Sequence, residues 1–254
     1  PHCYFLPLGI AWEEEGEEKL RTAMPAALAK VRLKSRMGWL YDASGDADFC
    51  RALVHAVGAG VTIPLAGAKL RCTPSLHYPD LAGDPLPARV RSLAQGTSNT
   101  AAVLEDRLFL KLYRRVQAGT SNEVEVSRYL TEVVHYPNVV RLAGSIELVT
   151  DSGEPSPVAM LQAYVKNQGD CWNYTLDYLG RYLDQERVAP LEEALGRAPT
   201  HHEPFLLQMQ ILGRQVAETR ILFHGDQQQV YFLGTTAGPI DQERFIVIEP
   251  IAVG

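Results

Sequence analysis

The sequence holds few cysteines, and they form no pattern that builds a site. The four are Cys3, Cys50, Cys72 and Cys171. No CxxC pair or His-rich spacing surrounds them, which disfavours both a zinc knuckle and a disulfide framework. We expect reduced and mostly buried thiols, because free cysteine behaves as a small apolar residue. The pair His201-His202 lacks a carboxylate-rich ligand set, so we expect it to lie in a solvated loop.

Long apolar runs and a surplus of positive charge are also missing. No apolar stretch approaches the length of a membrane span. The formal net charge is -6, so the chain has no basic surplus to neutralise a phosphate backbone or an anionic membrane. The start, PHCYFLPLGIAWEEEGEE, lacks the basic residues and cleavage site of a signal peptide. We therefore expect a cytoplasmic protein whose partners are neither nucleic acid nor membrane, but a small metabolite or another protein.

What the chain does have is enough apolar sequence for a core. It is 254 residues long and 46% hydrophobic, sufficient for one large domain or two small ones. The Pro/Gly-rich segment LHYPDLAGDPLPARVRSLAQG is typical of a boundary, which we place near residue 90. The expected parts are residues 1–90, 91–170 and 171–254.

Short strands and helices alternate along these parts. Ser44 or Asp46 is a candidate cap for a helix that ends near the glycines of VHAVGAG. Strands are expected in VVRLAGSIELV and PVAMLQAYV, and helices over Cys171 to Gln185 and Phe205 to Thr219. Two strand-like runs follow in the tail. The pattern predicts an α+β fold.

The segment AAVLEDRLFLKLY predicts a β-hairpin that turns at Glu105-Asp106. In its second strand three leucines alternate with Phe109, Lys111 and Tyr113, so Lys111 lies beside aromatic side chains on one face. The T-x-x-E form of a capping box, Thr120 to Glu123, then starts a helix. Glu125 lies next to the apolar stripe of this helix.

A strand lysine, a glutamate on the next helix and a late His-Gly-Asp are what a nucleotide-dependent phosphotransferase requires. The lysine holds phosphates, the glutamate holds the lysine, an aspartate accepts the proton of the acceptor hydroxyl, and a further carboxylate binds magnesium. The candidates are Lys111, Glu125, Asp226 and Glu249. Each alone has a simpler interpretation, since a strand lysine is most often a solvated edge residue. Their order along the chain favours the phosphotransferase.

Several long motifs carry a resemblance to a known family. They are YFLPLGIAW, GWLYDASGDADFCRALVHAVGAG, TSNTAAVLEDRLFLKLYRR, EVEVSRYLTEV and LQAYVKNQGDCWNYTLDYL. Over roughly residues 1 to 220 the chain resembles bacterial maltokinases, especially the kinase half of trehalose synthase/maltokinase fusion proteins. The resemblance implies a eukaryotic-protein-kinase-like small lobe over 91–170, with an N-terminal cap subdomain over 1–90. Residues 171–254 would hold the helices after the hinge and a degenerate catalytic-loop segment.

The resemblance also implies a reaction, in which ATP and maltose give maltose 1-phosphate and ADP with Mg²⁺ as cofactor. Lys111 would bind the phosphates and pair with Glu125, and Asp226 would be the catalytic base. The phosphate-covering loop would supply Gln95, Ser98, Asn99 and Thr100. The hinge that meets the adenine, Met160 to Val165, would supply Gln162 and Tyr164. The magnesium ligands would be Gln229 and Glu249.

The chain also departs from the family. The family's catalytic loop resembles HGDYHLGQV, whereas HGDQQQVYF is two residues shorter if Gln229 matches the family's glutamine. Glu249 stands where the family has a metal-binding aspartate, and most of the large helical lobe is expected to be absent. We therefore expect a kinase that is weak or inactive alone. The alternatives are a silent module that binds nucleotide or a trehalose synthase domain, and an unrelated α+β domain.

Overall fold

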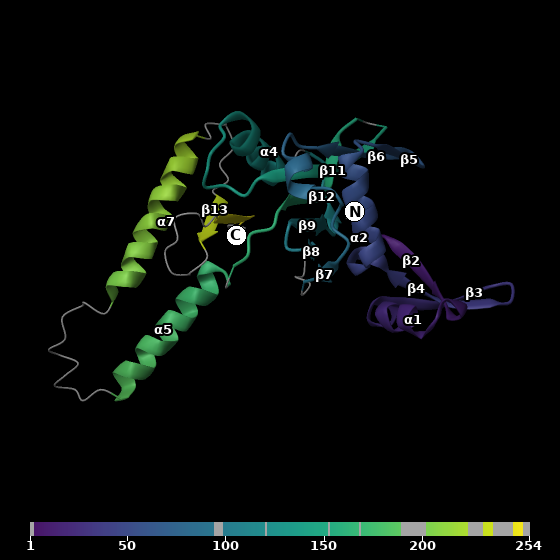
Figure 1. Cartoon of the computed structure of the whole chain (residues 1–254), viewed down its shortest axis with the longest axis horizontal. Coiled ribbons are helices and arrows are strands. Elements are labelled where there is room, and N and C mark those ends of the chain that lie inside the picture. The colour runs from purple at the N-terminus through teal and green to yellow at the C-terminus, as the bar shows by residue number, and fades with distance from the viewer. Residues whose placement is uncertain are drawn as a thin grey trace. The chain divides into compact units, whose positions relative to one another are not determined.

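The chain folds into two units of helices and antiparallel strands, seen in the computed structural model in Figure 1. The structure describes residues 3–93, 99–119, 121–151, 153–167, 169–188, 202–222, 231–235 and 246–250. One unit comprises Pro1–Arg128 and Arg141–Tyr164, and the other comprises Tyr129–Val140 and Val165–Gly254. The predicted α+β class is confirmed.

The first unit is built on a seven-stranded antiparallel sheet with the order β5-β6-β11-β12-β9-β8-β7. The strands are β5 (Thr62–Leu65), β6 (Ala68–Pro74), β7 (Val90–Ser92), β8 (Asn99–Leu104), β9 (Leu108–Tyr113), β11 (Leu142–Thr150) and β12 (Pro155–Ala163). Strands β5 and β6 come before the boundary predicted near residue 90, and β6 pairs with β11. Residues on both sides of that boundary therefore share one sheet.

Strands β8 and β9 form the predicted hairpin, which is confirmed. Its turn residues Glu105 and Asp106 have φ angles of 49° and 54°, the left-handed conformation that tight hairpin turns use. The leucines of β9 are buried, whereas Lys111 is only partly buried on the other side of the strand. The alternation predicted from the sequence therefore holds in the sheet.

Helices cover both faces of this sheet. On one face, α2 (Ala47–Gly58) and α3 (Tyr78–Ala82) pack on the buried leucines of β9 and on apolar side chains of β6, β11 and β12. Asp46 caps α2, as predicted, by accepting hydrogen bonds from the backbone N–H of Asp48 and Phe49. The other face carries α4 (Asn122–Arg128). Figure 1 shows α2 and α4 on opposite sides of the sheet.

A second, three-stranded sheet in this unit has the order β2-β4-β3. It consists of β2 (Leu8–Trp12), β3 (Ala27–Leu33) and β4 (Arg36–Asp42), and α1 (Glu17–Ala23) packs on it. Single turns of 3-10 helix lie at Glu13–Glu15, Met24–Ala26 and Ala43–Gly45. The short strands β1 (Cys3–Tyr4) and β10 (Arg115–Val116) pair just after β9. This pairing connects the N-terminal segment to the chain that leaves the hairpin.

The other unit contains a π-helical turn at Tyr129–Val133, the helices α5 (Cys171–Val188) and α7 (Glu203–Leu222), and the strand pair β13 (Tyr231–Thr235) and β14 (Ile246–Pro250). Both predicted helices are confirmed. His202 was expected in a solvated loop, but its ring lies edge-on to Tyr182 at 4.9 Å and contacts the Tyr178 hydroxyl. In the described part of the chain, no helix is long and apolar enough to cross a membrane.

Candidate functional site

Lys111, Glu123 and Tyr113 form a polar cluster between β9 and α4, in which Glu123 is buried and the other two are partly buried. The Lys111 ammonium donates to both carboxylate oxygens of Glu123, at 2.9 and 3.0 Å. The Tyr113 hydroxyl donates to Oε2 of the same carboxylate at 2.8 Å. The side chains of Lys111 and Glu123 are 11% and 7% exposed. A buried ammonium requires such a partner, since an unpaired charge there would be costly.

The partner of Lys111 is Glu123, and the predicted pairing with Glu125 is wrong. Successive residues of an α-helix turn by about 100°, so a glutamate two positions further along points to nearly the opposite side. Val124 packs on Leu142 and Met160, which turns the start of α4 toward the sheet and places Glu123 at Lys111. Glu125 is exposed.

The sequence pattern predicted a different role for Glu123, as the acidic member of a capping box. In the structure its carboxylate is bound to Lys111 and Tyr113. The Ser121 hydroxyl accepts a hydrogen bond from the backbone N–H of Val124 at 3.4 Å, near the start of the helix. Thr120 lies outside the described residues. The sequence pattern placed Tyr113 and Lys111 on one strand face, but no local signal distinguished Glu123 from Glu125 as their partner.

One row of side chains crosses this face of the sheet. The register pairs Thr73 with Ser145, Ser145 with Met160, and Met160 with Lys111. Paired residues in an antiparallel sheet point to the same side. Helix α4 lies over this row, with Glu123 at Lys111 and the Arg128 guanidinium 3.4 Å from the Ser145 hydroxyl.

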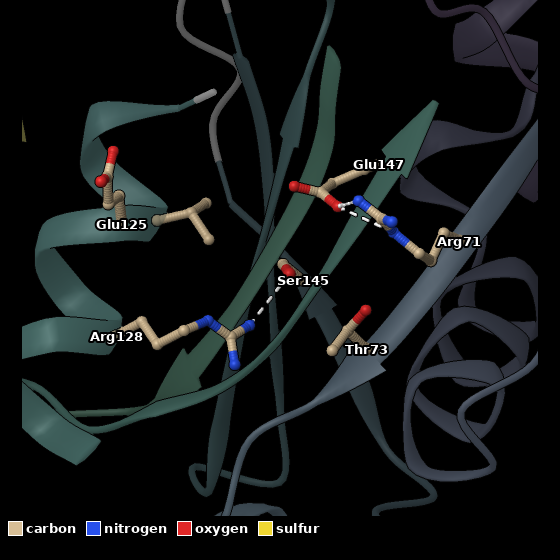
Figure 2. A pocket seen from close by; sticks show the side chains of 7 residues that line it. Arg71, Thr73, Glu125, Arg128, Ser145 and Glu147 are labelled. Atoms are coloured by element: carbon tan, nitrogen blue, oxygen red, sulfur yellow. Dashed lines mark hydrogen bonds and ion pairs between the residues drawn. The ribbon is translucent and has the colours of Figure 1, made fainter. Parts of the chain in front are cut away.

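A pocket of about 500 Å³ lies between α4 and strands β6 and β11 (Figure 2). Its lining residues are Arg71, Thr73, Val124, Glu125, Arg128, Ser145 and Glu147. Arg71 donates to the Glu147 carboxylate at 2.6 and 3.1 Å. Two guanidinium groups face two carboxylates here, so the lining has no net charge. Glu125, the residue predicted to hold Lys111, belongs to this pocket instead.

The predicted phosphate-covering loop is described only at its end. Gln95 and Ser98 lie outside the described residues, and Asn99 and Thr100 begin β8. Asn99 pairs with Tyr113 and shares the face of Lys111. Thr100 pairs with Leu112 on the core-facing side and is 2% exposed. The Asn99 side chain is therefore on the correct side of the sheet for a ligand at Lys111, and that of Thr100 is not.

The predicted hinge follows directly from β12. Gln162 pairs with Phe109 on one side and with Leu142 on the other, and is buried. The backbone N–H of Tyr164 donates to the Arg107 carbonyl at 2.7 Å. A hydrogen bond between the Tyr164 and Arg91 side chains raises the pKa of Arg91 above its ordinary value. Arg91 of β7 is thus beside the hinge, a position that the sequence did not indicate.

Of the predicted catalytic and metal residues, only Glu249 lies in the described part of the chain. Asp226 and Gln229 lie outside it. Glu249 is in β14, where it pairs with Phe232. Among the described residues, no group of three or more His, Cys, Asp or Glu side chains could hold a metal ion. The described residues thus offer a cation for a phosphate group at Lys111, but no magnesium ligand set.

No model of a known protein family matches this sequence.

Proposed function

We propose that the first unit is a kinase-like small lobe that binds ATP through Lys111. The observation that carries this proposal is the largely buried Lys111–Glu123 ion pair, with N–O distances of 2.9 and 3.0 Å, between a central strand and the helix that follows. A buried ion pair adds little net stability compared with apolar side chains of similar volume. Its presence in an otherwise apolar strand therefore favours a role in binding an anion.

The geometry suits a phosphate group. An ammonium group has three N–H donors, and two of them are directed at Glu123. The carboxylate fixes the position of the lysine, and a phosphate oxygen could accept the remaining donor. Asn99 on the same face could contact the same phosphates. Bound Mg²⁺ would neutralise charge on the transferring phosphoryl group.

The reaction we propose is the one implied by the resemblance to maltokinases, transfer of the γ-phosphoryl group from ATP to maltose. Asp226 would accept the proton of the sugar hydroxyl, and Gln229 and Glu249 would hold the metal. Backbone groups of Met160 to Val165 would bind the adenine. These roles rest on sequence motifs, whereas the role of Lys111 is also supported by its contacts with Glu123 and Tyr113.

A second candidate is nucleotide binding without efficient transfer, with a trehalose synthase domain as a possible binding partner. Two sequence features favour it. If Gln229 matches the family's glutamine, the segment HGDQQQVYF is two residues shorter than the family's loop, and Glu249 stands where the family has an aspartate. Magnesium demands near-ideal octahedral geometry, and a carboxylate on a chain one methylene longer would disturb it.

Calorimetry separates these candidates from an unrelated function. We expect the chain to bind ATP, and to bind it more tightly with Mg²⁺ than without. A phosphate-transfer assay with maltose then distinguishes a kinase from a silent nucleotide-binding module. Absence of ATP binding under both conditions would contradict both candidates.

A further inference from the structure

Tyr113 has contacts that the lysine–glutamate pair alone does not require. It is two residues after Lys111 on β9 and points to the same face of the sheet. Its hydroxyl donates to Oε2 of Glu123 at 2.8 Å, and its ring centroid is 5.5 Å from the Lys111 ammonium. The tyrosine therefore contacts both members of the ion pair.

The hydrogen bonds divide unequally between the carboxylate oxygens. Oε2 of Glu123 accepts from both Lys111 and Tyr113, whereas Oε1 accepts from Lys111 at 2.9 Å. Glu123 is 6% exposed, so solvent can do little to replace a lost donor. If Lys111 turns toward a phosphate, the Tyr113 hydroxyl still satisfies Oε2. The carboxylate then keeps its orientation while the lysine is shared between two anions.

We propose that Tyr113 is a positioning residue that holds Glu123, and through it Lys111, in the geometry that binds phosphate. This inference rests on the proposed nucleotide site. Tyr113 acts on the ligand only through Glu123 and Lys111. It makes the nucleotide site depend on a hydroxyl that the sequence motif of lysine and helix glutamate does not include.

The competing explanation is that Tyr113 only fills space. Its hydroxyl lies 3.7 Å from the Met160 sulfur, and the ring packs beside Val124, Leu142 and Met160. Phenylalanine would preserve this packing and remove the hydroxyl alone. Tyr113→Phe therefore tests the hydrogen bond, and Tyr4→Phe is a matched control because Tyr4 is 63% exposed on β1.

The first experiment compares the binding of ATP, ADP and adenosine by calorimetry. Tyr113→Phe should weaken ATP and ADP by about tenfold, because the loss corresponds to one hydrogen bond to a charged group acting indirectly. Adenosine carries no phosphate, so its affinity should stay unchanged. Tyr4→Phe should bind all three ligands like the parent. If Tyr113→Phe lost as much affinity for adenosine as for ATP, or lost no affinity for either, the positioning role would be overturned.

The second experiment needs no nucleotide. A double-mutant cycle in urea combines Tyr113→Phe with Glu123→Ala. Tyr113→Phe should destabilise the parent but have little further effect once Glu123 is removed. Additive effects would show that the two side chains do not interact, and would overturn the inference whatever the ligand. If the parent binds no ATP yet the cycle shows coupling, the nucleotide function fails and Tyr113 has only a structural role.

Discussion

Arg114 and Asp42 form an ion pair between the end of β9 and the three-stranded sheet, with 2.6 Å between Nη2 and Oδ2. The Ser44 hydroxyl contacts both side chains. Arg114 immediately follows Tyr113, and its carbonyl accepts a hydrogen bond from the backbone N–H of Phe5 at 2.8 Å. The hairpin that carries Lys111 is therefore joined to the N-terminal segment by charge and by backbone pairing.

This ion pair predicts a loss of stability in acid. Burial alone would raise the pKa of Asp42, but hydrogen bonds from Arg114 and Ser44 outweigh it and hold the pKa below the ordinary 3.8. The unfolded state then binds more protons near that pH, so stability falls as pH falls through the folded-state pKa. The contribution of the Asp42 carboxylate to the free energy of unfolding is therefore present above pH 3.8 and is lost as pH falls from there through the folded-state pKa.

Urea unfolding between pH 7 and pH 3 measures this effect. Asp42→Asn should lower the urea midpoint at pH 7 and flatten the decline toward pH 3. Because Asp46 also has a lowered pKa, some decline should remain in the variant. An unchanged slope in Asp42→Asn would show that Asp42 is not a major source of the pH dependence.

The buried thiols should resist labelling. Burial raises the pKa of Cys50 to about 12, so almost no reactive thiolate forms near neutral pH. Burial also raises the pKa of Cys72, whereas Cys3 is exposed. At pH 8 a thiol reagent should modify Cys3 rapidly, and Cys50 and Cys72 only after unfolding in urea. Mass spectrometry of labelled peptides would identify the sites, and fast labelling of Cys50 would argue against the packing of α2.

The apolar face of β9 should dominate the stability of the hairpin. Leu110 is 1% exposed in the cluster beneath α2, so Leu110→Ala should cost about 2–5 kcal/mol of unfolding free energy. Leu28 is 54% exposed, and Leu28→Ala should cost within about 0.5 kcal/mol. Urea denaturation compares the two. Similar costs would contradict the assignment of the buried face.

Much of this architecture could be predicted from the sequence because local rules decide it. Alternation in LFLKLY assigned the faces of β9, and Asp46 was one of the two residues predicted as a cap for α2. The membership of β6 in the large sheet could not be predicted, since its pairing with β11 joins distant segments such as Cys72 and Ile146. The Pro/Gly-rich segment between them marks a local irregularity without revealing this long-range pairing.

The candidate site likewise has some features that local sequence rules predict and one that depends on tertiary packing. The helix after Lys111 was predicted, but which glutamate faces the lysine depends on the rotation of α4. Packing of Val124 on Leu142 and Met160 of the sheet fixes that rotation. A helix of only seven residues has too short an apolar pattern to indicate this from sequence. The choice between Glu123 and Glu125 therefore required tertiary packing.

The two glutamates provide a matched pair for mutation. Glu123→Ala should weaken ATP binding by about 1.5–3 kcal/mol, because it removes the group that positions Lys111. Glu125→Ala should bind ATP like the parent, since Glu125 is exposed and lines the pocket at β6 and β11. Isothermal titration calorimetry measures both. If Glu125→Ala bound ATP more weakly than the parent and Glu123→Ala did not, the Lys111–Glu125 pairing first predicted from the sequence would be restored.

The most direct test of a nucleotide site at Lys111 is the ATP affinity of Lys111→Ala, measured by calorimetry with Mg²⁺ present. Lys69→Ala is the control, because Lys69 is an exposed lysine in the same sheet. We predict that Lys111→Ala keeps the parent's circular dichroism spectrum and loses about 1.5–3 kcal/mol of ATP binding energy, as for hydrogen bonds to a charged group. Lys69→Ala should bind ATP like the parent. Equal ATP affinity in the parent, Lys111→Ala and Lys69→Ala would contradict the site.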